Sequence, residues 1–277
     1  MQETPPQQQR VRQRRAQLGL SAALGVLAVL VLLAALVTAR ALTEDRSAPE
    51  PSTTPPSPAL TPEKGSGAWE VAAQHRLARR EMAQLPPAAA HPHAVSTETA
   101  GPPISLPAPD SSRGGWIPTG FPATPQGALA QLAALDEAAM RGADPATYAR
   151  GYHELALTGA PNPETTGLYA VLTSMRDSAG LRPIGSVAGL RADYEITHAQ
   201  IKGTTDQGRY VVACVLGQFS VTYHGRTVSA GVGDCQALRR VEGRWRLSPG
   251  PLPAAAPSAW PGSVEAVRAG YRPIQEA

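Results

Sequence analysis

The residues whose type and spacing most clearly suggest chemistry are Cys214 and Cys235. They are the only cysteines in the 277-residue chain, and they could form a disulfide or bind a metal. Between them, His224-Gly225 separates two runs of alternating residues and is typical of a two-residue hairpin loop. Counting outward from that loop brings Cys214 opposite Cys235 in a non-hydrogen-bonded pair, where Cα atoms approach to ~4.5 Å. A disulfide tolerates that separation, so the sequence predicts a bridge between the two cysteines.

The predicted register has support of its own and leaves alternatives open. It places Ser220 opposite Ser229, and such cross-strand pairs are favourable contacts. A bulge at Gly231 or Gly233 would shift the register by one residue. A pair of buried thiols is the main alternative to the bridge. A zinc site would need two further ligands, and the chain has no third cysteine.

A second group of residues could do acid–base chemistry. Asp234 lies on the strand face that we expect to point toward the helices, and Tyr148, Tyr152 and His153 belong to a helix that borders the same space. Burial raises the pKa of a carboxyl group, which suits it to general acid–base catalysis. The plainer interpretation is that Asp234 ends its strand near solvent or bonds a helix side chain, and this is the one we expect.

Other signatures of catalysis and cofactor binding are missing. The sequence contains no P-loop, no G-x-S-x-G, no H-E-x-x-H and no glycine-rich dinucleotide turn. His91-Pro92-His93 lacks the further ligands that a metal site requires. Residues 121–277 carry 14 basic and 13 acidic side chains, so they lack the excess of positive charge that is typical of nucleic-acid-binding domains. We therefore expect no enzyme activity, cofactor, metal or nucleic-acid partner.

The N-terminal region predicts a membrane anchor. Residues 18–39 are 22 residues without a charge, and a helix of that length spans the ~30 Å hydrocarbon core of a bilayer. The basic tail 1–17 favours a cytoplasmic N-terminus and contains Arg10, Arg12, Arg14 and Arg15. The following residues would then lie outside the cytoplasm, where disulfides persist. The alternative is a cleaved signal peptide, although its apolar core is usually shorter.

The next residues are rich in proline, since 16 of the 28 prolines lie between residues 44 and 125. Residues 40–67 are predicted as a disordered linker and 86–122 as a second Pro-rich linker, because such compositions bury little surface. Between them, 68–85 has apolar residues at helical spacing and is predicted as a stalk helix. This helix packs on the domain or stays solvated. A short oligomer contact and a rest on lipid head groups are further interpretations.

Residues 123–250 predict an α+β outer domain of three helices followed by a curved antiparallel sheet. Thr124-Pro125, Asp144-Pro145 and Asn162-Pro163 each place a capping residue before a proline, which is typical of a helix start. After Gly189 the apolar period changes to two. This predicts strands at 190–204, with a bulge near His198, and at 209–223, 226–240 and 244–248. One face of strand 209–223 should pack on the helices, and the other is more polar.

The C-terminal residues 251–277 predict a Pro-rich arm followed by a short helix. Ser263 is the expected N-cap of that helix. Trp260 precedes Pro-Gly and is expected to pin the arm to the domain. Exposed instead, it would be a partner-binding hot spot.

The order of these elements resembles the nuclear transport factor 2-like fold, a cone of helices cupped by a curved sheet. The layout of basic tail, anchor, stalk and outer domain resembles the bitopic scaffold components of bacterial type IV secretion and conjugation machines. The runs "GFPATPQGALAQLAALDEAA" (120–139) and "PSAWPGSVEAVRAGYR" (257–272) are similar to membrane proteins of actinobacterial mobile elements.

This resemblance implies a single-pass scaffold of the cell membrane, with its C-terminal domain outside the cytoplasm. Its expected partners are the lipid bilayer, other envelope proteins and further copies of itself. The alternative function is an extracytoplasmic domain whose cone binds a small ligand or acts as an acid–base enzyme. An open pocket with convergent polar groups would favour that alternative, whereas a filled cone would favour the scaffold.

Overall fold

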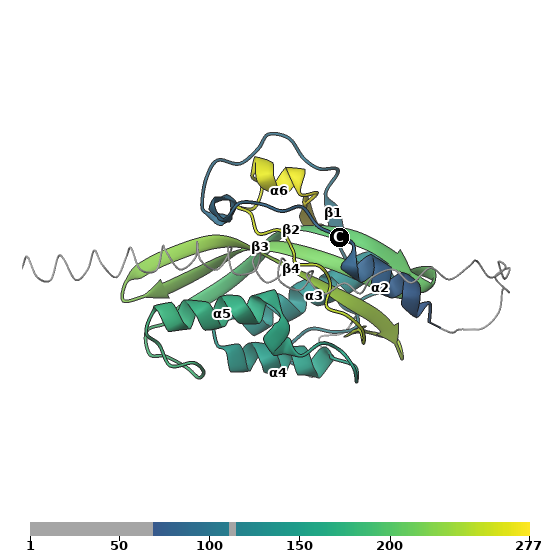
Figure 1. The fold of residues 1–277 in the computed structure, drawn as a ribbon, viewed down its shortest axis with the longest axis horizontal. Coiled ribbons are helices and arrows are strands. Elements are labelled where there is room, and N and C mark those ends of the chain that lie inside the picture. Colours follow the sequence, from purple (N-terminus) through teal and green to yellow (C-terminus); the bar gives the residue numbers. More distant parts are fainter. Residues whose placement is uncertain (1–68, 111–114) are drawn as a thin grey trace, which may run out of the picture.

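The computed structural model describes residues 69–110 and 115–277, which form a mixed α+β fold around a curled, half-barrel sheet (Figure 1). The predicted basic tail 1–17, apolar segment 18–39 and linker 40–67 lie outside the described residues. Among the residues that are described, no helix is both long enough and apolar enough to cross a membrane.

The sheet has six strands in the order β1-β6-β2-β3-β4-β5. Neighbouring strands are antiparallel except β1 and β6, which are parallel. The long central strands predicted from the alternating pattern are present, and the sequence did not predict the short pair β1 and β6. The strands are β1 (Ile104–Leu106), β2 (Arg191–Thr205), β3 (Tyr210–Tyr223), β4 (Arg226–Val241), β5 (Arg244–Leu247) and β6 (Arg272–Glu276).

Three helices cover one face of the sheet, which we term the helix side: α3 (Pro125–Met140), α4 (Pro145–Leu155) and α5 (Gly167–Ser178). The predicted caps are present, since Thr124 Oγ1 accepts a 3.0 Å hydrogen bond from the Gly127 amide and Asp144 Oδ1 accepts one of 3.2 Å from Ala146. The third helix differs from its prediction. Asn162 caps a short 3₁₀ helix, η3 (Pro163–Thr165), and the extended backbone of Thr166 starts α5 anew.

The β3–β4 hairpin has the register that the sequence predicts. Tyr223 faces Arg226 and Cys214 faces Cys235, with no shift between these pairs. His224 and Gly225 have φ values of 50° and 73°, as the predicted tight loop requires. The bulge expected near His198 is also present, and a second one lies between Ile201 and Gly203.

The opposite face of the sheet, which we term the arm side, differs from the prediction of a more polar surface. Val212, Cys214 and Leu216 are fully buried there, because two chain segments cover them. The covering elements are α2 (Val71–Arg79), the 3₁₀ helix η2 (Pro87–Ala90), the arm 251–262 and α6 (Val264–Arg268) (Figure 1). The expected linker 86–122 thus contributes η2 and β1. A short turn, η4 (Asp206–Gly208), joins β2 to β3.

Backbone contacts hold these covering segments together. The Ala254 amide donates to Ala78 O at 2.9 Å, and the Trp260 amide donates to Ala89 O at 2.6 Å. The helix within 68–85 therefore packs on the domain, and Trp260 lies where the arm meets η2. Ser263 caps α6 as predicted, accepting from the Ala266 amide at 3.2 Å.

Two glycines allow the arm to approach the sheet closely. A Cβ atom on Gly231 would lie 1.7 Å from Ala259 O, and one on Gly233 would lie 2.6 Å from Pro257 O. Neither glycine introduces the register shift considered above. Both leave space for the backbone of the arm, which is a common reason for glycine within a strand.

Candidate functional site

The helix side brings together three of the four residues predicted for a site in the cone. Asp234 on β4 faces the helices and is 4% exposed. Tyr148 and Tyr152 on α4 are buried, with ring centroids 6.2 Å apart. His153 is exposed and is therefore not part of this buried group.

Asp136 on α3 is a further member that the sequence analysis missed. Its side chain is 0% exposed, and neither carboxyl oxygen has a hydrogen-bond partner in the structure. One signal could have revealed it: Asp136 follows Leu135 and stands four residues after Leu132. A carboxyl group thus interrupts the apolar stripe of a helix that packs on β2 and β3.

The other polar groups around this space are bonded, with one exception. Gln236 Nε2 donates to both oxygens of Asp234, at 3.2 and 2.9 Å. Tyr194 donates its hydroxyl hydrogen to Val232 O at 2.8 Å, and the hydroxyl of Tyr148 shares a 3.0 Å bond with Thr166. The hydroxyl of Tyr152 has no partner. An unpartnered phenol and an unpartnered carboxyl group thus lie in the same dry interior.

Burial dominates the electrostatics of the site. It raises the pKa of Asp136 well above its usual value, and the negative charges of Asp234 and Glu137 raise it further. Burial also raises the pKa of Asp234 to about 6, although bonds from Gln236 and the Cys235 amide oppose the change. Burial raises the pKa of Tyr152 as well, and both aspartates add to that effect. The phenol therefore stays protonated.

This arrangement can hold protons, but it offers no path to a substrate. Each member is at most 4% exposed, and large side chains fill the surrounding space. A reacting group must come within about 3 Å of a general base. In this arrangement of helices and sheet, the carboxyl and phenol groups of the site are therefore shielded from solvent.

The arm side contains the predicted disulfide. Cys214 and Cys235 are bonded, with Cα atoms 4.1 Å apart. Both sulfurs lie in an apolar cluster with Ala89, Ala259 and Tyr271. The bridge therefore crosslinks the hairpin directly beneath the arm, and it replaces the alternatives of a free thiol pair and a zinc site.

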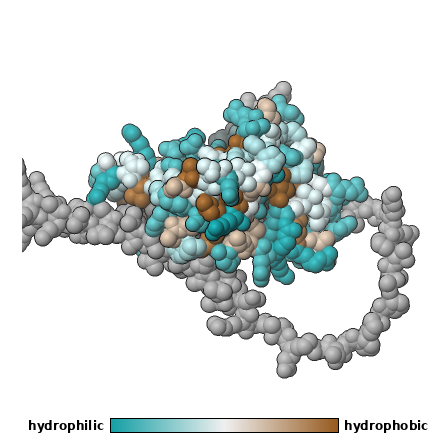
Figure 2. All heavy atoms as spheres, turned by 90° about the horizontal axis from the view of Figure 1, so that it is seen from above, coloured by the Kyte–Doolittle hydropathy of each residue, from teal (hydrophilic) through white to brown (hydrophobic). Residues whose placement is uncertain are grey.

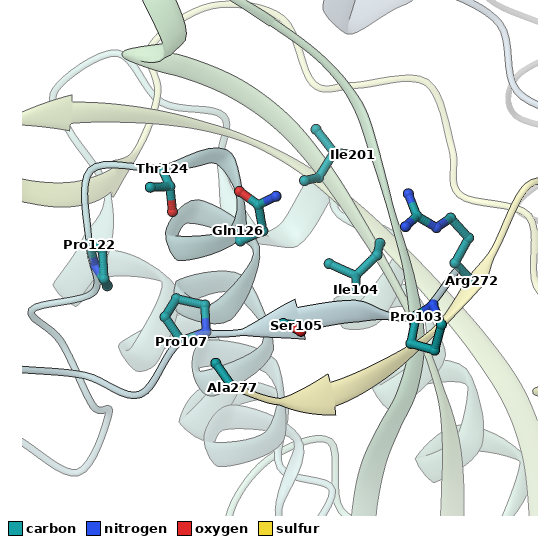
Figure 3. A pocket seen from close by; sticks show the side chains of 10 residues that line it. All are labelled: Pro103, Ile104, Ser105, Pro107, Pro122, Thr124, Gln126, Ile201, Arg272 and Ala277. Atoms are coloured by element: carbon teal, nitrogen blue, oxygen red, sulfur yellow. The ribbon is translucent and has the colours of Figure 1, made fainter. Parts of the chain in front are cut away.

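The structure also has a shallow depression of about 440 Å³ near the start of α3 (Figure 3). Ile104 and Ile201 supply apolar walls, and Arg272 is already engaged, donating from Nε to Pro102 O at 2.6 Å. None of the residues predicted for the cone lies here. The lining residues are Pro103, Ile104, Ser105, Pro107, Pro122, Thr124, Gln126, Ile201, Arg272 and Ala277.

One histidine of the 86–122 segment makes a structural contact. His93 Nε2 lies 3.0 Å from Glu265 Oε2 and so joins this segment to α6. Within residues 69–110 and 115–277, no three His, Cys, Asp or Glu side chains are grouped so that they could hold a metal ion.

Comparison of the chain with family models, with curated proteins and with solved structures gives no match. The interpretation of its function therefore rests on its own residues and their geometry.

Proposed function

We propose that the chain is a non-enzymatic, single-pass membrane scaffold whose outer domain, with a nuclear transport factor 2-like cone, docks other envelope proteins in a conjugation or type IV secretion-like machine. The observation that carries this proposal is the filled cone. Leu129, Leu132, Tyr148, Tyr152 and Phe219 are each at most 1% exposed on the helix side. A ligand-binding cone would instead leave an open cavity with convergent polar groups.

The outer surface offers features that suit a docking role. Figure 2 shows hydrophobic patches among hydrophilic ones on the view from above. Val95 and Val264, from the segments of the arm side, are 66% and 41% exposed. Contiguous exposed apolar patches with a polar rim are typical of protein interaction sites.

Helix α2 adds a basic surface next to these segments. Arg76, Arg79 and Arg80 surround a depression of about 450 Å³ together with His75 and Glu81. Arg80 donates to Lys202 O, and Arg76 and Arg79 are exposed. Charges at the edge of an interface steer association and select partners. We expect an acidic surface of an envelope protein to bind here.

Two charge reversals test this docking role. Arg76→Glu with Arg79→Glu should lower crosslinking to envelope partners and lower transfer in the host, while thermal stability stays unchanged. Arg244→Glu with Arg246→Glu, on β5, is the matched control with the same change in net charge. Equal crosslinking and transfer in all three proteins would contradict a docking surface on α2.

Protease digestion tests the topology. Protease added to intact spheroplasts should remove the outer domain and leave the tail 1–17 protected. Digestion of the tail from outside would contradict the orientation. A soluble mature protein beginning near residue 42 would identify the apolar run as a signal peptide.

One observation favours the alternative of a ligand-binding or acid–base domain. Asp136 and Tyr152 direct unpartnered polar atoms into the interior, and a small polar ligand could bond both. That function would require the cone to open. It predicts that Asp136→Asn abolishes activity in the host without lowering thermal stability, whereas the scaffold proposal predicts unchanged activity.

A further inference from the structure

The two buried aspartates on the helix side come from different layers of the fold. Asp136 lies in the middle of α3, and Asp234 lies in β4, so their charges act across the boundary between helix and sheet. A buried ionised carboxylate is strongly disfavoured unless it is paired or hydrogen bonded. The surroundings of each carboxyl group therefore decide which of them carries a charge.

Another buried ionic side chain shows how this fold satisfies a charge. Arg176 on α5 is 0% exposed, and its guanidinium donates to Ala143 O, Arg182 O and Gly185 O at 2.6, 2.9 and 2.8 Å. Asp144 lies 3.9 Å away and supplies a counter-charge. Asp136 has neither a donor nor a cation among its partners.

The two aspartates also differ from each other in the hydrogen bonds that their carboxyl groups receive. Gln236 Nε2 donates to both oxygens of Asp234, and donated hydrogen bonds stabilise the ionised form. No group donates to Asp136, so its neutral acid form is favoured. The geometry thus assigns the negative charge to Asp234 and the proton to Asp136.

We propose that Asp136 and Asp234 act as a proton-binding pair that holds one proton at neutral pH, and that the packing of α3 on the sheet is stable only while that proton is bound. Loss of the proton leaves two carboxylates in a dry interior, and their repulsion weakens the packing of α3 on β2 and β3. This inference does not depend on the proposed docking function.

The neighbouring groups offer no compensating positive charge. Glu137 on α3 adds a negative charge near Asp136. Tyr152 and Tyr148 on α4 and Tyr194 on β2 are protonated phenols, because burial raises the pKa of each. From β4, Gln236 is neutral. On the arm side, burial also raises the pKa of Tyr271, which interacts electrostatically with Asp234.

The sign of the pH dependence follows from the two aspartates. A carboxyl group whose pKa is higher in the folded state stabilises the fold fully below its unfolded pKa of about 4. That stability is lost as the pH rises through the folded pKa. For Asp234 the loss is complete above about 6, and for Asp136 it continues to higher pH. Between the two pKa values of one group, the unfolding constant rises about tenfold per pH unit.

Urea unfolding of the full chain in detergent, followed between about pH 5 and pH 8, tests the pair. In the unmodified protein the unfolding constant should rise about tenfold per pH unit near neutrality, for one bound proton. In Asp136→Asn this rise should disappear above about pH 6, the pKa of Asp234, because the amide cannot lose a proton. Asp193→Asn, at an exposed position on β2, is the matched control and should keep the rise.

An infrared measurement keeps the proposal testable even if Asp136→Asn does not fold. At neutral pH the unmodified protein should show the C=O stretch of a protonated carboxyl group, which shifts in heavy water. The band should persist in Asp234→Asn. Absence of the band from the unmodified protein, or an equal pH dependence in the Asp136 variant and the control, would overturn the proposal.

Discussion

The two faces of the sheet solve the same packing problem in opposite ways. On the helix side, large side chains such as Leu132, Tyr148 and Phe219 fill the space between the helices and the curled sheet and enclose two carboxyl groups. On the arm side, small residues let backbone lie on backbone, and a disulfide crosslinks the strands beneath. The helix side thus encloses two carboxyl groups, whereas the arm side encloses a disulfide and one lysine, Lys202.

Removal of the disulfide should have the largest effect on stability. Cys214→Ala with Cys235→Ala should lower the free energy of unfolding by ~2–4 kcal/mol, because the unfolded chain regains the freedom of the closed loop. Urea unfolding with and without reductant measures this loss. Ser220→Ala with Ser229→Ala removes a cross-strand hydrogen bond of 2.8 Å from the same hairpin. This control should cost only ~1 kcal/mol, and an equal loss in both double variants would contradict the special role of the bridge.

Substitution of Gly231 should have the next largest effect. In Gly231→Ala the new methyl group meets Ala259 O at 1.7 Å, so the arm must move and stability should fall by ~1–3 kcal/mol. Thermal unfolding measures the loss, and hydrogen exchange should show faster exchange in the arm. Gly167→Ala is the control, since no atom lies within 4 Å of its added Cβ. Unchanged exchange in the arm would show that the close approach is dispensable.

Substitution of Lys202 should have the smallest effect, and it separates the pH dependence of stability on the arm side from that on the helix side. Lys202 donates to Ala78 O at 3.0 Å on the arm side, and burial lowers its pKa to about 8. A lysine with a lowered folded pKa lets stability rise with pH between about 8 and its unfolded value of about 10.4. In urea unfolding, Lys202→Met should remove this rise of stability at alkaline pH. The loss of stability near neutral pH that the aspartates cause should persist. A rise that survives the substitution would assign it to another group.

The parts of the fold that the sequence predicted are those fixed by local rules. The register of β3 and β4 follows from the His224-Gly225 loop and the alternation of faces, which leaves little freedom. Helices α3 and α4 begin where Thr124 and Asp144 cap them, because a cap acts within its own turn. The disulfide then follows from the register.

The arm side could not be predicted in the same way. Between its helices, η2 and the arm consist largely of alanine and proline residues, which carry no helical or strand period, and the contacts of this side join distant residues such as Ala78 and Ala254. Asp136 was missed for a related reason. A single polar residue in an apolar stripe reveals its importance only when the opposite layer, with Asp234, is known.

The central claim is that the cone serves packing and the surface serves docking, and one paired measurement on Asp234→Asn tests it most directly. Thermal stability and transfer in the host should be measured on the same variant of the full chain. We predict a change in stability of no more than ~1–3 kcal/mol, since the new amide can still accept from Gln236, together with unchanged transfer. Full stability with abolished transfer would contradict the claim, because loss of a general base typically costs ~10²–10⁴-fold in rate.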